Sequence, residues 1–330
     1  MKGARTAMSS AVNTVLGPVP ADDLGVVAVH EALLSVLPGA EHAFDITVDR
    51  AEIFEILARK LADFRAHGGG TIVDSTGMFH GRDLRLYEAL SRSTGVHIVA
   101  STGMGPEKLL GGYFLTPQTN PPTPWPADKF ARLFTQEVTE GMVVPRVERR
   151  AAAGLVATAA TREGMTATDE SLLRGAARTA LATGVPLSVR YGADAVHDLE
   201  IVLDEKLPAD RVVIGGLDRA DALAAGAPLE VARRGAYVAL DHVGSGVGSD
   251  GGVTDEDRAA LVLDLVQAGH GERVLLSANA IGVAKGHPGN DLPFSHVLSE
   301  FVPLLTARGL GDEDVRRILA GNPRDLLSVR

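Results

Sequence analysis

The chain contains no cysteine, and this absence narrows the chemistry that it can perform. Disulfide bonds, cysteine-ligated zinc and thiolate catalysis are all excluded. Aromatic residues are also scarce, at 4% of the chain, and the single tryptophan is Trp125. The lack of cysteine agrees with a cytoplasmic protein, which is the location that we expect.

Basic residues are also fewer than acidic residues. The 32 Lys and Arg residues stand against 42 Asp and Glu, which gives a formal net charge of −10. Nucleic acids and anionic membranes require clustered basic side chains, and here these side chains are scattered, so we expect neither partner. No apolar run approaches the roughly 18 residues of a membrane span. The segment from Met1 to Gly17 lacks the apolar core of a signal peptide.

Eight short apolar runs rich in Val and Ile are spaced along the chain, and each has the length of a β-strand. The segments between them carry apolar residues three and four positions apart, which predicts helices over Ile53–Phe64, Leu172–Ala182 and Ala259–Gln267. The eight predicted strands are Val26–Val29, Thr71–Asp74, His97–Ser101, Gly154–Thr158, Pro186–Val189, Val212–Gly215, Tyr237–Asp241 and Val274–Ser277.

Strands that alternate with helices indicate parallel βα units. Eight such units favour a closed (β/α)₈ barrel, the TIM barrel, over an open sheet. We therefore expect an α/β protein in which residues 1–330 form a single barrel domain and residues 1–13 form a flexible N-terminal extension.

Three loops interrupt this regularity. Gly103–Pro126 contains Trp125, and Ile281–His296 follows the eighth predicted strand. Long loops after barrel strands lie at the C-terminal face, where active sites are built, although they can also be tolerated surface insertions. A third loop, Gly244–Val253, contains five glycines and is a candidate lid.

Short distinctive segments are spread in order from about residue 14 to residue 327. They are Thr14–Val19, Leu24–Gly25, His30–Glu31, Thr71–Thr76, Gly81–Asp83, Thr102–Gly103, Ala182–Pro186, Leu240–His242, Leu275–Ser277, Phe301–Leu305 and Asn322–Pro323. Together these segments resemble the phosphotriesterase-related family of the amidohydrolases. The resemblance implies a barrel that hydrolyses phosphotriesters, lactones or other esters with two divalent metals bridged by a carboxylated lysine and a hydroxide.

The resemblance also assigns six positions to metal ligands, and five of them carry a different residue here. The first position keeps its imidazole, His30. The other five are Ala32, Ala157, Arg190, Gly216 and Asn279. Alanine and glycine have no donor atom, and arginine places a positive charge where a cation should bind. We therefore expect no zinc, manganese or cobalt pair and no other cofactor.

Three residues are the candidate catalytic set: His30, Arg190 and Asp241. At the end of a barrel strand, Arg190 should point into the barrel mouth, where it could bind an anion or stabilise an oxyanion. Alternatively it forms a salt bridge with Glu31 or Asp241 and fills the cavity. His30 has carboxylates nearby and is a candidate general acid or base.

Further side chains near the strand ends are candidate substrate contacts. Tyr191 follows Arg190 directly, and Lys285 belongs to the loop after the eighth predicted strand. The full set is Glu31, Tyr191, Asn279, Lys285, His287, Trp125 and His242.

Three functions are consistent with these residues. The first is a metal-independent enzyme, of hydrolase, lyase or cyclase type, that acts on a small anionic or carbonyl-containing molecule. The second is a non-catalytic small-molecule binder or scaffold. The third is a hydrolase with one metal held by His30, Asp241 and Asn279. We expect the first, with a small-molecule ligand as partner, and a homodimer is possible because members of the family often dimerise.

Overall fold

Nine parallel strands form one continuous sheet in the computed structural model, which describes residues 10–110, 115–116, 123–144, 148–247 and 251–329. The first eight are β3 (Val26–Val36), β4 (Gly69–Asp74), β5 (His97–Thr102), β10 (Leu155–Ala159), β11 (Leu187–Arg190), β12 (Val212–Gly215), β13 (Tyr237–Leu240) and β14 (Val274–Leu276). Each of the eight predicted runs overlaps one of these strands, so the predicted strand positions are confirmed, although β3 extends to Val36, beyond the predicted end at Val29.

The ninth strand closes the barrel. β15 (Ile281–Lys285) follows β14 after a short turn and pairs in parallel with β3, with Ile281 opposite Ala32 and Lys285 opposite Val36. The sheet order is β14-β13-β12-β11-β10-β5-β4-β3-β15. The prediction of a loop over Ile281–His296 is therefore wrong for Ile281–Lys285, whose backbone pairs within the sheet.

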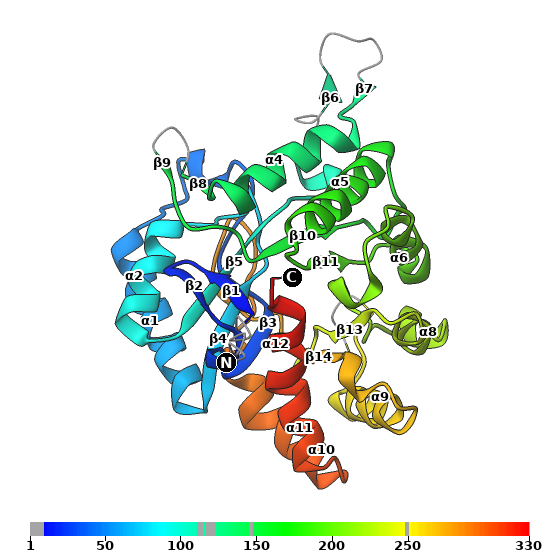
Figure 1. The fold of residues 1–330 in the computed structure, drawn as a ribbon. Coiled ribbons are helices and arrows are strands. Elements are labelled where there is room, and N and C mark those ends of the chain that lie inside the picture. The colour runs from blue at the N-terminus through cyan, green and yellow to red at the C-terminus, as the bar shows by residue number, and fades with distance from the viewer. Residues whose placement is uncertain (1–9, 111–114, 117–122, 145–147, 248–250, 330) are drawn as a thin grey trace, which may run out of the picture.

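Helices surround the strands on the outside (Figure 1). The longer ones are α1 (Arg50–Ala66), α2 (Leu84–Thr94), α4 (Ala127–Thr139), α5 (Ala167–Thr183), α6 (Ala195–Asp204) and α9 (Asp255–Gln267). The shorter ones are α3 (Glu107–Leu110), α7 (Ala220–Ala224), α8 (Ala227–Arg233), α10 (Val302–Ala307), α11 (Asp312–Arg316) and α12 (Asn322–Leu327). Ile53–Phe64, Leu172–Ala182 and Ala259–Gln267 fall in α1, α5 and α9, as predicted.

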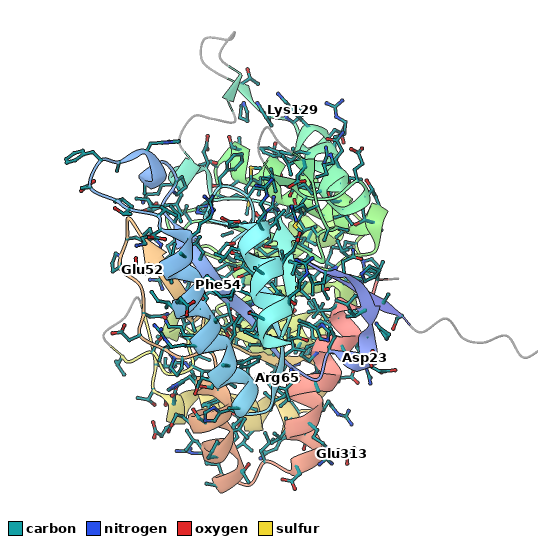
Figure 2. The ribbon with its side chains drawn as sticks, turned by 90° about the vertical axis from the view of Figure 1, so that its left-hand side faces the viewer. Asp23, Glu52, Phe54, Arg65, Lys129 and Glu313 are labelled. Carbon is teal, nitrogen blue, oxygen red and sulfur yellow. The ribbon has the colours of Figure 1, made fainter. Side chains whose placement is uncertain are left out.

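Local sequence signals fix where several helices begin. α5 and α9 each start with a capping box, in which a threonine and an aspartate three residues later bond each other's backbone amides. At α1 the Asp49 carboxylate accepts hydrogen bonds from the first amides of the helix. α1 and α2 pack side by side, and Glu52, Phe54 and Arg65 are labelled on α1 in Figure 2.

Two apolar layers follow from the alternation of side chains along each strand. One layer lies between the strands and the helices and includes Leu57, Phe130 and Val262, all fully buried. The other fills the barrel interior with side chains such as Val73 and Val213. The barrel is therefore a packed core, and space for a ligand is found at its mouth.

The N-terminal end of the barrel is covered by the two ends of the described chain. The strands β1 (Ala11–Thr14) and β2 (Gly17–Pro20) form a hairpin, and Val12 belongs to the same interior layer as Leu326 of α12. The amide of Val329 donates to the carbonyl of Ala11. The predicted extension over residues 1–13 is therefore corrected for residues 11–13, which form part of β1, while residues 1–9 lie outside the described residues.

The two other predicted loops are only partly described. The short strands β6 (Leu115–Thr116) and β7 (Thr123–Pro124) lie within Gly103–Pro126, and β8 (Val143–Val144) and β9 (Glu148–Arg149) form a further hairpin. Residues 111–114 and 117–122 lie outside the described part, as do residues 248–250 of the predicted lid. No helix in the described part of the chain is long and apolar enough to cross a membrane.

Candidate functional site

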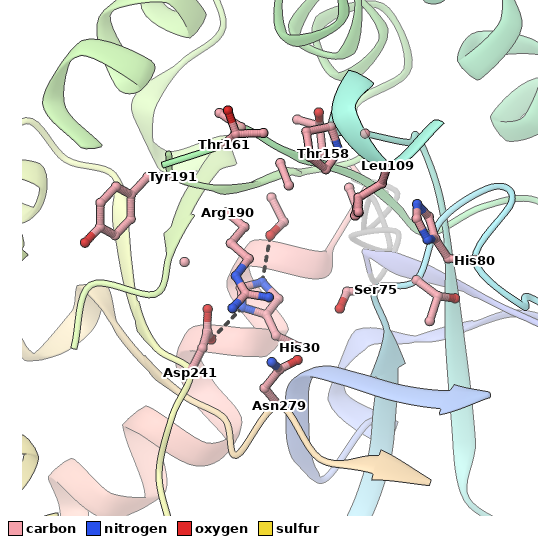
Figure 3. A pocket seen from close by; sticks show the side chains of 18 of the residues that line it. His30, Ser75, His80, Leu109, Thr158, Thr161, Arg190, Tyr191, Asp241 and Asn279 are labelled. Atoms are coloured by element: carbon pink, nitrogen blue, oxygen red, sulfur yellow. Dashed lines mark hydrogen bonds and ion pairs between the residues drawn. The ribbon is translucent and has the colours of Figure 1, made fainter. Parts of the chain in front are cut away.

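A cavity of about 620 Å³ opens at the C-terminal ends of the barrel strands. Its wall includes four candidates from the sequence that lie close together in Figure 3: His30, Arg190, Asp241 and Asn279. Ala32 and Ala157 also line it, so five of the six positions that the resemblance assigns to metal ligands meet at one place. The family resemblance therefore located the cavity, although the residues at these positions have changed.

His30 is held by a carboxylate on one side and a hydroxyl on the other. Its Nδ1 atom lies 2.8 Å from Oδ1 of Asp241, and its Nε2 atom lies 2.8 Å from Oγ of Ser188. All three residues are buried, with 5–7% of their surface exposed. The sequence left the carboxylate partner of His30 open, and in the structure this partner is Asp241, which follows the end of another strand.

The electrostatics of His30 are set by that carboxylate. Burial alone lowers the pKa of the imidazole, because it penalises the charged form. The charge and the hydrogen bond of Asp241 outweigh this effect, so the pKa of His30 is raised above its ordinary value. Arg190 acts in the opposite direction, which shows that its guanidinium is close enough to influence the imidazole.

The backbone positions Asp241. Its Oδ2 atom accepts the amide of Gly216 at 2.7 Å, and its own amide donates to Oδ1 of Asp218 at 3.1 Å. Glycine is required at position 215, because a Cβ atom there would lie 2.5 Å from Oδ2 of Asp241. The carboxylate is thus fixed from two sides before any ligand binds.

Asp218 organises the turn that follows β13. It accepts the backbone amide of His242 at 2.8 Å, pairs with the imidazole of His242 at 2.7 Å and pairs with the fully buried Arg258 at 2.8 Å. Burial raises the pKa of Asp218, but hydrogen bonding to His242 and the charge of Arg258 outweigh it and lower that pKa to about 2. His242 therefore serves this turn and is not among the residues that line the cavity, and its role as a substrate contact stays a prediction.

Glu31 lies beneath the cavity wall and holds the turn between β14 and β15. Its carboxylate accepts the Ser277 hydroxyl at 2.9 Å, the Ala278 amide at 3.3 Å and the Ala280 amide. Burial raises the pKa of Glu31 to about 7, against the opposing effect of these hydrogen bonds. The residue is 1% exposed and is not among those that line the cavity, and its role as a substrate contact stays a prediction.

A shift of register between β3 and β4 lies beside His30 and Glu31, two adjacent residues with different partners. Ala28 pairs with Ile72 and Glu31 with Asp74, so β3 has one residue more than β4 in this interval. Such a bulge re-aims the side chains around it. It lies at the point from which His30 contacts Asp241 while Glu31 contacts the β14–β15 turn.

Arg190 is exposed in the mouth of the cavity. Within the described residues its guanidinium has no hydrogen bond and no ion pair, so the predicted salt bridge to Glu31 or Asp241 is not formed. The Asn279 carboxamide also lines the cavity and has no side-chain hydrogen bond to a described residue. Nε2 of His80, a further lining residue, is buried without a partner in the described part of the chain. Polar groups able to bind a ligand therefore surround the same space.

The remaining candidates divide between the cavity wall and other places. Tyr191 lines the cavity but lies apart from His30 in Figure 3, beneath the Arg219 guanidinium, and its hydroxyl donates to Asp221 at 3.0 Å. His287 lines the cavity and its Nε2 atom lies 2.8 Å from the Ser35 hydroxyl.

Two predicted contacts lie away from the cavity. Lys285 ends β15, and its backbone pairs with Val36. The ring centroids of Trp125 and Phe130 are 5.6 Å apart. The Nζ atom of Lys129 lies over the Trp125 ring, 3.5 Å from its centroid. Neither is among the residues that line the cavity, and their role as substrate contacts stays a prediction.

The residues present do not fit the two-metal centre of the family type. Ala157 and Gly216 offer no donor atom, and Arg190 brings a positive charge to the same place. In the described part of the chain no three His, Asp or Glu side chains are grouped so that they could hold a metal ion. The expectation that the protein holds no metal pair stays a prediction.

A closed barrel with a polar cavity at the C-terminal ends of its strands is the arrangement of α/β-barrel enzymes. The family model of the phosphotriesterase family matches residues 10–327, so this chain belongs to that family. The expected family and fold are thereby confirmed.

Individual relatives show what this barrel is similar to. A phosphotriesterase homology protein of Mycobacterium tuberculosis (strain ATCC 25618 / H37Rv) is 26% identical, over 95% of this chain and 96% of that protein. An N-acetyltaurine hydrolase of Salmo salar is 24% identical, over 98% of this chain and 100% of that protein. An aryldialkylphosphatase of Saccharolobus solfataricus is 25% identical, over 94% of this chain and 97% of that protein.

A solved structure has the same fold as this chain. It comes from the molecular engineering of organophosphate hydrolysis activity from a weak promiscuous lactonase template, and it superimposes with a TM-score of 0.83. The two chains are 25% identical, and the match covers 96% of this chain and 99% of the other.

Sequence reasoning missed several polar residues that line the cavity, and Ser188 and His80 are two of them. Ser188 lies within a predicted strand and has no local motif, so only the fold brings its hydroxyl to His30. His80 precedes Gly81–Asp83, a segment that resembles the family, yet the segment gives no sign that its imidazole lines the cavity. The alternation along β11 offers one indirect signal, because Ser188 and Arg190 are two residues apart and share a face.

Proposed function

We propose that this protein is a hydrolase that cleaves a small ester, lactone or amide bearing an anionic group, without a binuclear metal centre. One observation carries the proposal. A buried His30–Asp241 pair and the guanidinium of Arg190, which has no ion-pair partner among the described residues, line the same cavity.

Arg190 supports the choice of an anionic substrate. A guanidinium binds carboxylate, sulfonate or phosphate groups through two parallel hydrogen bonds, and these charge-assisted bonds are stronger than neutral ones. The exposed position of Arg190 in the cavity mouth allows such binding. The relative named N-acetyltaurine hydrolase is consistent with this chemistry, because N-acetyltaurine is an amide that carries a sulfonate.

The His30–Asp241 pair supports hydrolysis. An imidazole whose Nδ1 atom is hydrogen-bonded to a carboxylate presents Nε2 as a general base, and the charge of Asp241 stabilises the imidazolium that forms. The carboxylate of Asp241 raises the pKa of His30, which makes the imidazole a stronger base.

The alternative of a scaffold with a plugged barrel agrees less well with the cavity. A plug predicts that Arg190 forms a salt bridge, and no ion pair of Arg190 is present within the described residues. The alternative of a single metal held by His30, Asp241 and Asn279 would require the 2.8 Å contact between His30 and Asp241 to break.

Paired ester substrates test the proposal. The first is a p-nitrophenyl ester with a terminal carboxylate, and the second is its neutral alkyl counterpart of equal length. We expect kcat/KM to favour the anionic ester by about 10- to 100-fold, which corresponds to the ~1.5–3 kcal/mol of hydrogen bonds to a charged group. Arg190→Met should remove this preference mainly through KM.

The matched control is Arg234→Met, an arginine on the outside of the barrel that pairs with Glu200 and Glu230. It should leave the preference unchanged. A wild type that turns over neither ester would contradict the proposed hydrolase, and equal kcat/KM values for the two esters would contradict the role of Arg190.

A further inference from the structure

Ser188 occupies an unusual place among the polar groups of the cavity. It lies in the middle of β11, paired with Ala157 of β10 and Val213 of β12. It lines the cavity although only 5% of the residue is exposed. β11 and β3 are not neighbours in the sheet, so the contact of Ser188 with His30 crosses the barrel.

The small residues around Ser188 keep its hydroxyl open to the cavity. Ala157, its neighbour on β10, stands at the position that the family resemblance assigns to the bridging lysine, and it also lines the cavity. Gly215, on β12, lines the cavity from the other side. A Cβ atom at position 215 would lie 2.5 Å from Oδ2 of Asp241 and 3.5 Å from the His30 ring, so glycine leaves room for the His30–Asp241 pair.

The hydrogen bonds fix the protonation of the three residues. Oδ2 of Asp241 accepts the Gly216 amide, which identifies the carboxylate as an acceptor. Nδ1 of His30 must therefore donate to Oδ1 of Asp241. In a neutral imidazole the other nitrogen is then an acceptor, so the Ser188 hydroxyl donates to Nε2.

We infer that Ser188 is a catalytic nucleophile, activated by His30 and Asp241 as a Ser–His–Asp triad assembled from β11, β3 and the turn after β13. The inference rests on the proposed hydrolase function and names the group that attacks the substrate. It replaces a metal-bound hydroxide by a serine hydroxyl as the nucleophile at the barrel mouth.

The reaction balances with water as the only co-reactant. Oγ of Ser188 bonds to the carbonyl carbon while its proton passes to Nε2 of His30. The bond from that carbon to the leaving oxygen or nitrogen breaks, and the leaving group takes the proton from Nε2. Water then attacks the acyl-serine and gives one proton to Nε2. That proton returns to Oγ as the carboxylic acid departs.

Arg190 fits the same arrangement. It is two residues beyond Ser188 on β11, so both side chains project to the cavity side of the strand. A substrate anchored through its anion by Arg190 would extend its acyl group along the strand towards Ser188. Ser188 therefore lies on the same side of β11 as the residue that would bind the substrate's anion.

Phosphonylation with a fluorophosphonate tests the inference directly. Attack by Ser188 breaks the P–F bond, forms an Oγ–P bond and releases fluoride together with the serine proton. We expect one adduct per chain by intact-protein mass spectrometry, located by peptide mapping on Ser188. Ser188→Ala should abolish it.

The matched control is Ser91→Ala in α2. Ser91 is as deeply buried as Ser188, but its hydroxyl donates to the carbonyl of Val96. This variant should keep the adduct. The inference is overturned when the wild type forms no adduct or when the adduct persists in Ser188→Ala.

A second variant uses the absence of cysteine from the chain. Ser188→Cys introduces a single thiol, and its alkylation by iodoacetamide near neutral pH reports both access and activation. We expect alkylation that is about tenfold slower when His30→Asn is added, because the imidazole no longer draws off the proton. A thiol that does not react, or one that is indifferent to His30→Asn, overturns the inference even when Ser188→Ala fails to fold.

Steady-state hydrolysis separates the two proposals. Full kcat in Ser188→Ala overturns the triad and leaves the proposed hydrolase function standing. Labelling of Ser188 in a wild type that hydrolyses none of the paired esters supports the triad and overturns the proposed substrate class.

Discussion

Nδ1 of His30 lies 2.8 Å from Oδ1 of Asp241, although the two residues come from strands that do not pair with each other. The same imidazole is the one metal-ligand residue that the sequence retains among the six positions assigned by the family resemblance. In this protein it is engaged by a carboxylate and a serine hydroxyl. The structure therefore gives the retained imidazole the partners of a general base.

Asp241→Asn should impair catalysis by placing the wrong tautomer on His30. The Gly216 amide needs an acceptor, so the new carboxamide will turn its oxygen to Gly216 and its NH₂ group to Nδ1 of His30. The proton then moves to Nε2, which can no longer accept from Ser188. We expect kcat to fall by about 10³- to 10⁴-fold, measured by steady-state kinetics, with nitrogen NMR of the imidazole reporting the tautomer.

A suitable control for that variant is Asp264→Asn on the exposed face of α9. It removes the same charge away from the cavity and should leave kcat unchanged. If Asp241→Asn keeps kcat within a few-fold of the wild type, the pair does not act as a base.

Glu31 should make the stability of the fold depend on pH. Its folded pKa of about 7 lies above the ordinary 4.5, so the folded state holds a proton that the unfolded state has released between those values. The stabilisation is complete below the unfolded pKa and is lost as the pH rises through about 7. Relative to Glu31→Gln, we expect the wild type to lose about 2 kcal/mol between roughly pH 5 and pH 8.

Urea unfolding of both proteins at several pH values measures this difference. Groups that titrate alike in both proteins cancel, but the charge of Glu31 also raises the pKa of His30, so the slope belongs to Glu31 together with its effect on His30. The glutamine also places an NH₂ group near the Ala278 and Ala280 amides, which should make the variant less stable at low pH. A difference between the two proteins that does not change with pH would show that Glu31 is ionised in the fold throughout this range.

Arg258 should be essential for stability. Its side chain is fully buried and pairs with Asp218 at 2.8 Å and Asp255 at 2.7 Å. Arg258→Met leaves the buried Asp218 carboxylate without this cationic partner, and such losses cost about 3–5 kcal/mol. The comparison is Arg234→Met, whose more exposed ion pairs should contribute about 1 kcal/mol or less in the same urea titration. Equal losses in the two variants would contradict the role of the buried pair.

Much of the barrel could be predicted from sequence because strand patterning is local. Runs such as Val212–Gly215 are apolar on both faces, since one side-chain layer packs inside the barrel and the other against the helices. β15 was missed because Gly282 and Lys285 break its apolar pattern. Its strand conformation depends on pairing with β3, which is distant in sequence.

The candidate site could be predicted only in part, for the same reason. Arg190 follows an identifiable strand end, and the structure places it in the cavity as expected. Ser188, by contrast, is a candidate only because its hydroxyl contacts His30, which is 158 positions away in sequence. Glu31 likewise has its partners, Ser277, Ala278 and Ala280, in a turn that is distant in sequence.

Metal content measured together with turnover tests the central claim most directly. The protein should be purified without added metal, analysed by elemental mass spectrometry and assayed on the carboxylated ester before and after dialysis against a strong chelator. We predict well below one zinc, manganese or cobalt atom per chain and an unchanged kcat. About two metal atoms per chain, with activity lost on chelation and restored by the metal, would contradict a hydrolase that uses His30, Asp241 and Arg190 in place of a binuclear centre.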